Sequence, residues 1–131
     1  MTFVSNTRTT YVALGIGMSS KATTDEVRLL VHQALRNRRL DLDDVRVVAT
    51  RERFVLDRRL DLGVPVDGVS DDRLVAASAP CTRPVGLQAR VAETAALLAA
   101  GDGDAELIGP VDRSAHATVA VARERGTGGS R

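Results

Sequence analysis

The chain has 131 residues, of which 44% are hydrophobic and 27% are charged, as in an ordinary globular domain that folds in water. This length suffices for one hydrophobic core, so we expect a single domain over residues 10–123, with flexible ends at 1–9 and 124–131. A formal net charge of +1 creates no long-range field that would attract nucleic acid. One tyrosine and two phenylalanines offer no platform for exposed bases, so we expect no nucleic-acid partner.

Cysteine usage and hydropathy predict where the protein works. The one cysteine, Cys81, cannot form an internal disulfide, which fits a reducing compartment. No apolar run approaches the length of a membrane span, and the first residues lack the charged and apolar regions of a signal peptide. We therefore expect a cytoplasmic protein without a membrane partner.

The first element is a buried strand over Tyr11–Leu14 that runs into a glycine-spaced turn and then a helix. The two glycines allow a positive φ or a close approach to a ligand, and the hydroxyls and ammonium that follow suit an anion beside a helix N-terminus. The motif is neither a complete G-x-G-x-x-G fingerprint nor a P-loop, so a purely structural turn is the alternative. The ligand-binding residues predicted in this segment are Gly15, Gly17, Ser19, Ser20 and Lys21.

A helix should follow, because Thr23 and Glu26 have the spacing of a capping box and apolar residues recur on one helical face from Val27 onward. A second strand is predicted over Val45–Thr50, which is rich in β-branched residues. The helix should end in three cations that suit a helix C-terminus and that we expect to be solvated. These are Arg36, Arg38 and Arg39.

The middle of the chain predicts short elements. Phe54–Leu62 has a roughly helical pattern that Gly63 would stop, and residues 64–66 form a short strand in which a proline favours an edge position. Ser70 can cap a brief helical turn. Residues 76–84 contain two prolines and are expected to be a loop.

Longer elements return in the last third of the chain. Small residues dominate a predicted helix from Gln88 to Gly101, which would let the helix lie close to a sheet. Glu106–Gly109 predicts a short strand, and His116–Ala122 predicts a strand covered on both faces. The order of elements predicts an α/β fold, a three-layer α/β/α sandwich with a mostly parallel, mixed sheet of about five strands. We expect the last two strands to add an antiparallel edge.

Cations recur in the loops expected at or near the carboxyl ends of the strands, where ligands of α/β proteins gather. Lys21 follows the first strand, Arg51 and Arg53 follow Thr50 at the end of the second, and Arg83 lies in a later loop. Guanidinium groups bind carboxylates in bidentate fashion, so these residues predict a site for a polyanion. The alternative is that they are ordinary surface cations balanced by nearby acids. We add Thr50, Arg51 and Arg53 to the predicted ligand-binding residues.

No catalytic or metal-binding constellation assembles from the sequence. His32 and His116 are far apart and have no cysteine or second histidine at ligand spacing, so we expect both to be structural or surface residues and predict no metal site. Cys81 lies in an irregular segment, and a lone thiol is more often inert than nucleophilic. We predict no cofactor and assign no catalytic residue.

Five segments carry a resemblance because they occur in order and at suitable spacing: Ala13–Thr24, Leu40–Thr50, Leu62–Val66, Val85–Gly101 and Ala117–Arg123. Together they resemble the cobalamin-biosynthesis family of CobE and the C-terminal domain of CbiG. The resemblance implies a small three-layer α/β domain that handles a precorrin or cobalt-precorrin intermediate during construction of the corrin ring. If the chain is an enzyme, the resemblance implies the opening of a ring lactone on a cobalt-precorrin, as in CbiG.

Three functions are compatible with these observations. The first is a CobE-like protein that binds a precorrin-type tetrapyrrole, whose peripheral carboxylates would meet the cationic loops. The second is a small-anion or nucleotide-phosphate binding module that uses the turn over residues 15–24. The third is a noncatalytic partner subunit of another corrin-pathway enzyme.

Overall fold

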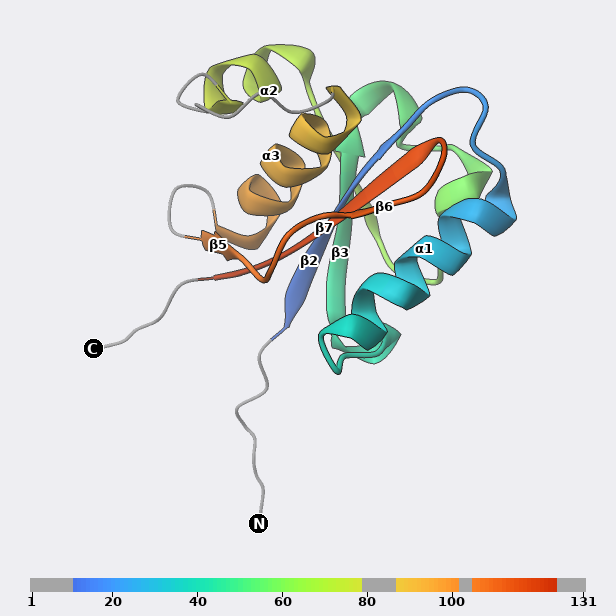
Figure 1. The fold of residues 1–131 in the computed structure, drawn as a ribbon. Coiled ribbons are helices and arrows are strands. Elements are labelled where there is room, and N and C mark those ends of the chain that lie inside the picture. The colour runs from blue at the N-terminus through green and yellow to red at the C-terminus, as the bar shows by residue number, and fades with distance from the viewer. Residues whose placement is uncertain (1–10, 79–86, 102–104, 125–131) are drawn as a thin grey trace, which may run out of the picture.

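The computed structural model describes residues 11–78, 87–101 and 105–124, within which the chain forms a six-stranded sheet, three α-helices and short 3-10 turns (Figure 1). The strands are β2 (Val12–Met18), β3 (Val45–Arg51), β4 (Val66–Val69), β5 (Ala105–Leu107), β6 (Asp112–Arg113) and β7 (Ala117–Glu124). The helices are α1 (Thr24–Asn37), α2 (Asp71–Ser78) and α3 (Leu87–Gly101), and the 3-10 turns are η2 (Leu42–Asp44), η3 (Glu52–Phe54) and η4 (Arg58–Leu60). The flexible ends predicted at 1–9 and beyond Glu124 lie outside the described residues.

The sheet has the strand order β4-β3-β2-β7-β5, and β6 also pairs with β7. Strands β2, β3 and β4 are parallel neighbours, whereas β7 is antiparallel to β2, β5 and β6. This arrangement confirms the predicted α/β sandwich with a mostly parallel, mixed sheet. The prediction that the last two strands add an antiparallel edge is also confirmed, because β7 and β5 form the end of the sheet beyond β2 and β7 is antiparallel to both β2 and β5. Residues 117–122 of β7 are all buried, which confirms the prediction of a strand covered on both faces.

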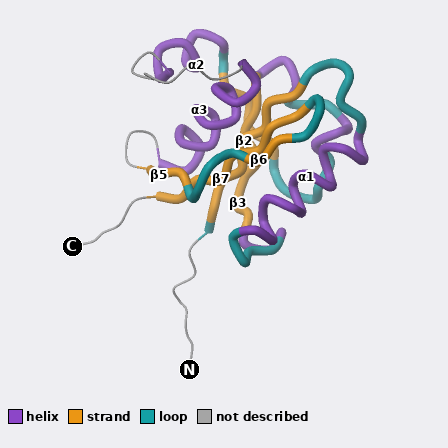
Figure 2. The backbone as a smooth tube through the Cα atoms, in the orientation of Figure 1, coloured by secondary structure: helices purple, strands orange, loops and turns teal. Residues whose placement is uncertain are grey.

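Helix α1 covers one face of the sheet with branched aliphatic side chains (Figure 2). As predicted, Thr23 caps the helix, and its side chain accepts a hydrogen bond from the backbone N–H of Glu26 at 3.1 Å. The buried residues of α1 recur at helical spacing and pack on side chains such as Leu14 and Ile16 of β2. They are Val27, Leu30, Val31, Ala34 and Leu35.

Helix α3 covers the opposite face (Figure 2). It lies close to β2 because alanine and glycine form the centre of this contact. A Cβ atom built on Gly15 would lie 1.8 Å from the carbonyl oxygen of Ala92 and 2.6 Å from the backbone nitrogen of Ala96. The predicted turn at Gly15 and Gly17 is therefore wrong. Strand β2 continues through both glycines, since all its residues from Val12 to Met18 are buried between α1 and α3.

The predicted helix over Phe54–Leu62 is replaced by the two 3-10 turns η3 and η4. The side chain of Asp57 accepts the backbone N–H of Arg59 at 2.9 Å and starts η4 separately from η3. The predicted strand at 64–66 appears later, as β4. Ser70 is placed as expected, because its hydroxyl accepts the backbone N–H of Arg73 at the start of α2.

One of the three arginines at the end of α1 differs from its prediction. The side chain of Arg38 is only 7% exposed and donates hydrogen bonds to the carbonyl oxygens of Ala34 at 2.7 Å and Ile108 at 2.5 Å. It also forms an ion pair with Asp112 at 2.8 Å. The expectation of solvation holds for the exposed Arg36 and Arg39, whereas Arg38 joins α1 to the segment between β5 and β6.

The contact at Gly15 predicts a large cost for the smallest substitution. We expect Gly15→Ala to lower the free energy of unfolding by about 3 kcal/mol, because the added methyl meets backbone atoms of α3 that cannot move without shifting the helix. Gly101→Ala is a matched control, since its methyl would meet the flexible side chain of Glu124 at 3.3 Å. Urea denaturation of both variants measures the difference. Equal stability of the two variants would contradict the close packing.

Candidate functional site

The carboxyl ends of β2, β3 and β4 meet at one edge of the sheet, because these strands are parallel neighbours. We call this the strand-end edge and define it by the segments 19–22, 50–59 and 70–71. This is the place where α/β folds bind ligands. The segments come from three loops that are separated in sequence, so the topology of the sheet brings them together.

A small hollow lies between β2, β3 and α3 at the strand-end edge. Its volume is about 20 Å³, enough for one water molecule. Thr50 lies in its lining, fully buried, and its hydroxyl donates to the carbonyl oxygen of Ile16 at 2.8 Å. This hydrogen bond connects the ends of β2 and β3. The hydroxyl proton of Thr50 is therefore not available to a ligand. The hollow is lined by Ile16, Gly17, Met18, Thr50, Arg51, Phe54 and Val91.

The predicted cations at the strand-end edge differ in whether their side chains already bind other groups of the protein. Arg51 donates from Nε and Nη2 to the carboxylate of Asp71, both at 3.2 Å. These hydrogen bonds lower the pKa of Asp71. Arg53 is exposed, and its guanidinium lies 5.2 Å from the ring centre of Phe54. Lys21 is exposed, and among the described residues no hydrogen bond or ion pair holds its ammonium group.

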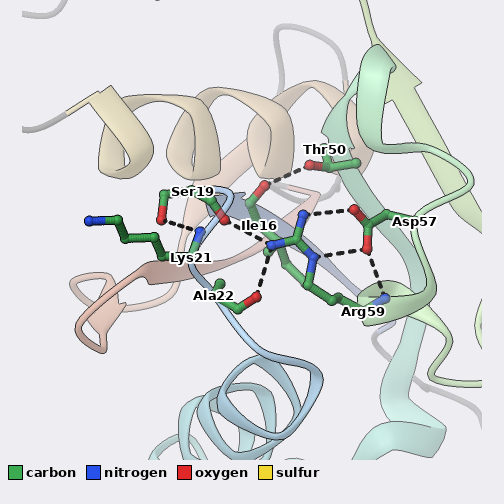
Figure 3. A network of polar contacts seen from close by, with 7 residues as sticks. All are labelled: Ile16, Ser19, Lys21, Ala22, Thr50, Asp57 and Arg59. Atoms are coloured by element: carbon green, nitrogen blue, oxygen red, sulfur yellow. Dashed lines mark hydrogen bonds and ion pairs between the residues drawn. The ribbon is translucent and has the colours of Figure 1, made fainter.

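Arg59 holds the loop between β2 and α1 (Figure 3). Its Nη1 donates to the carbonyl oxygens of Ser19 at 2.8 Å and Ala22 at 3.0 Å. Its Nε and Nη2 donate to the two carboxylate oxygens of Asp57, at 2.9 and 2.7 Å. In the same view the side chain of Lys21 points away from this network.

The charges of Asp57 and Arg59 stabilise each other. Hydrogen bonds from the Arg59 side chain lower the pKa of Asp57, against the opposing effect of burial. The same hydrogen bonds raise the pKa of Arg59. The sequence singles out neither Asp57 nor Arg59. The only local signal was an aspartate two residues before an arginine, which is too common to identify a site.

Glu26 adds an acid next to the strand-end edge. Its carboxylate accepts a short hydrogen bond from the hydroxyl of Ser114 and another from the backbone N–H of His116 at 2.6 Å. The bond from Ser114 is the main reason that the pKa of Glu26 is lowered. The carbonyl of His116 in turn accepts the backbone N–H of Ser19 at 3.0 Å. Glu26 therefore links the start of α1 to the β6–β7 hairpin.

Most of the predicted site residues lie at the strand-end edge: Ser19, Ser20, Lys21, Thr50, Arg51 and Arg53. Gly17 lies in β2 and lines the hollow next to this edge. Gly15 lies farther back in β2, against the backbone of α3. Arg83 and Cys81 lie outside the described residues. His32 is exposed on α1, and the described residues contain no group of three side chains that would hold a metal ion. None of the helices described here is long and apolar enough to span a bilayer.

Comparisons with known proteins agree with this fold. The family described as "Cobalamin synthesis G C-terminus" matches residues 12–122, and no curated protein matches the chain. CobE, a protein from the cobalamin (vitamin B12) biosynthetic pathway, has a similar structure, with a TM-score of 0.72 and 24% identity over 87% of this chain and 90% of that chain. A cobalamin biosynthesis protein G homologue from Sulfolobus solfataricus gives 0.69 and 25% identity, over 88% of this chain and 37% of that chain. Cobalamin biosynthesis protein chiG from Agrobacterium tumefaciens strain C58 gives 0.67 and 24%, over 88% and 99%.

The Asp57–Arg59 pair predicts a pH dependence of stability. Because folding lowers the pKa of Asp57, its carboxylate stabilises the protein above the ordinary aspartate value of about 3.9, and this contribution is lost as the pH falls through the lower folded value. We expect Asp57→Asn to reduce the free energy of unfolding near neutral pH and to matter progressively less below about pH 4. Urea denaturation of both proteins across this range measures the effect. A pH-independent difference would contradict it.

Proposed function

The chain belongs to the cobalamin synthesis G C-terminus family, and we propose that it binds a polycarboxylated tetrapyrrole intermediate of the precorrin type at the strand-end edge. The observation that carries this proposal is the gathering of Lys21, Arg51 and Arg53 at one edge of the sheet. Lys21 and Arg53 are exposed there. Their hydrogen bonds to a carboxylate would be charge-assisted and therefore stronger than hydrogen bonds between neutral groups. The peripheral carboxylates of such a ring suit these cations.

The ligand rests on the strand-end edge and not inside the sheet. The hollow between β2, β3 and α3 holds no more than a water molecule, so a macrocycle lies over it. The loop after β3 presents apolar surface beside the cations, because Phe54 is half-buried and Leu56 is 92% exposed. A ring with an apolar face and a charged rim suits this combination.

Arg51 contributes less than the other two cations. Its guanidinium already meets the carboxylate of Asp71, so ligand binding would have to compete with that pair. Lys21 and Arg53 carry no such ion pair among the described residues. We therefore assign the direct carboxylate contacts to Lys21 and Arg53, with Arg51 as a secondary contact.

A double substitution tests the electrostatic contacts. We expect Lys21→Ala combined with Arg53→Ala to weaken uroporphyrin binding at low salt by at least about tenfold, because two charge-assisted contacts are lost. Arg36→Ala combined with Arg46→Ala is the matched control, since it removes the same charge from two exposed arginines away from the strand-end edge. Titration followed by visible absorbance measures both, and coproporphyrin, which has fewer carboxylates, should bind the unmodified protein less tightly.

Equal losses of uroporphyrin affinity in the two double variants would show that net charge, and not the strand-end edge, determines binding.

A second experiment tests the class of ligand. The protein purified from cells that also express corrin-ring enzymes should carry a visible chromophore. A colourless protein that instead binds a nucleotide would favour the small-anion module, and a colourless protein that copurifies with a pathway enzyme would favour a partner subunit.

A further inference from the structure

We infer that Arg59 is a positioning residue, which holds the backbone of residues 19–22 in the conformation that presents Ser20 and Lys21 to the ligand. This inference rests on the proposed function for its ligand, but the hold on the loop is a separate property that can be measured without one.

The loop after β2 is closed around the Arg59 guanidinium. The N–H of Ala22 donates to the carbonyl of Ser19 at 3.2 Å, which makes residues 19–22 a tight turn. Both carbonyls at the ends of this turn accept hydrogen bonds from the same atom, Arg59 Nη1. Ser20 and Lys21 lie between these two anchored carbonyls. Their exposed side chains are therefore carried by a backbone held at both ends.

Arg59 is itself held from two sides. Its Nε and Nη2 form a bidentate ion pair with Asp57, and its side chain is 15% exposed. Its guanidinium also lies 5.7 Å from the ring centre of Phe54. Phe54 in turn lines the hollow at the strand-end edge and meets Arg53. The arginine is thus fixed relative to both loops that carry the proposed ligand contacts.

Arg59 is unsuited to bind the ligand directly. Its charge is compensated by Asp57, and three of its nitrogen atoms already donate to protein oxygens. Taking a ligand carboxylate would require it to release the turn or the aspartate. Among the cations of the strand-end edge, Lys21 and Arg53 therefore face the ligand and Arg51 is a secondary contact. Arg59 sets the position of Lys21.

Fixing the loop in advance favours binding. A free loop of this kind would lose conformational freedom when the ligand orders it, and each ordered backbone residue costs free energy. In the folded protein Arg59 has already ordered residues 19–22, so binding does not have to supply that free energy. The same bonds also set the start of α1, because Thr23 and Thr24 follow directly on Ala22.

The closing experiment uses Arg59→Lys in the full chain. Lysine keeps the positive charge, but its one nitrogen has three N–H donors and cannot replace the four hydrogen bonds that Arg59 makes from three nitrogen atoms. We expect amide hydrogen exchange at Ala22 to become about tenfold faster and uroporphyrin affinity to fall about tenfold. Both are measured well below the unfolding temperature of the variant.

The matched control is Arg38→Lys, at the other end of α1. Arg38 likewise donates to backbone carbonyls and pairs with an aspartate, but it lies away from the strand-end edge. We expect this control to lower Tm while exchange at Ala22 and uroporphyrin affinity stay within about twofold of the unmodified protein.

The outcomes separate the two proposals. Unchanged exchange at Ala22 in Arg59→Lys would overturn the positioning role, as would losses of affinity that merely follow Tm in both lysine variants. Faster exchange together with normal affinity would also overturn it, because the loop would then not matter for binding. Failure of the unmodified protein to bind uroporphyrin, with faster exchange in Arg59→Lys, would overturn the proposed function and support the hold on the loop.

Discussion

The backbone contact between β2 and α3 constrains the rest of the structure, because no side chain fits between Gly15 and the carbonyl of Ala92. At this separation only small residues fit at the centre of the layer between the sheet and α3, and alanines from β2, β7 and α3 form it. Larger side chains such as Val69 and Val91 pack farther along, near β4 and α2. The other face has no such limit and is filled by leucine, isoleucine and valine. The two faces of one sheet are therefore held by different means, close approach on one side and aliphatic volume on the other.

Polar contacts anchor helix α1 at both ends. Arg38 joins its C-terminal end to the segment before β6, and Arg59 joins the loop at its N-terminal end to η4. Both arginines pair with an aspartate and donate hydrogen bonds to backbone carbonyls. These contacts compensate the charges of two side chains that are largely shielded from water. One anchor maintains the fold at a distance from the proposed site, and the other shapes the site itself.

The sequence predicted what depends on local patterns and missed what depends on distant partners. The helix capped by Thr23 and the buried strand over 117–122 were recognised from capping and hydropathy. The two glycines of β2 were placed in a turn, because glycine permits a turn and a close helix contact equally well, and only the position of α3 decides between them. Arg59 was missed because its carbonyl partners are about 40 residues away. Lys21, Arg51 and Arg53 were placed near the strand ends because they follow predicted strands, although β2 ends at Met18 and not at Leu14. Their contact with a ligand stays a prediction.

The pairing of β2 with β7 has a consequence for the order in which the protein is made. The register pairs Val12 with Arg123 and Met18 with Ala117. Strand β2 therefore cannot form this pairing until β7 has been synthesised. During synthesis one edge of β2 stays without its neighbour until nearly the whole domain has left the ribosome, although β3 can already pair on the other side. Folding is therefore completed by contacts of high sequence separation, which form slowly. The backbone N–H and C=O groups along this edge of β2 are the last in the strand to find their partners.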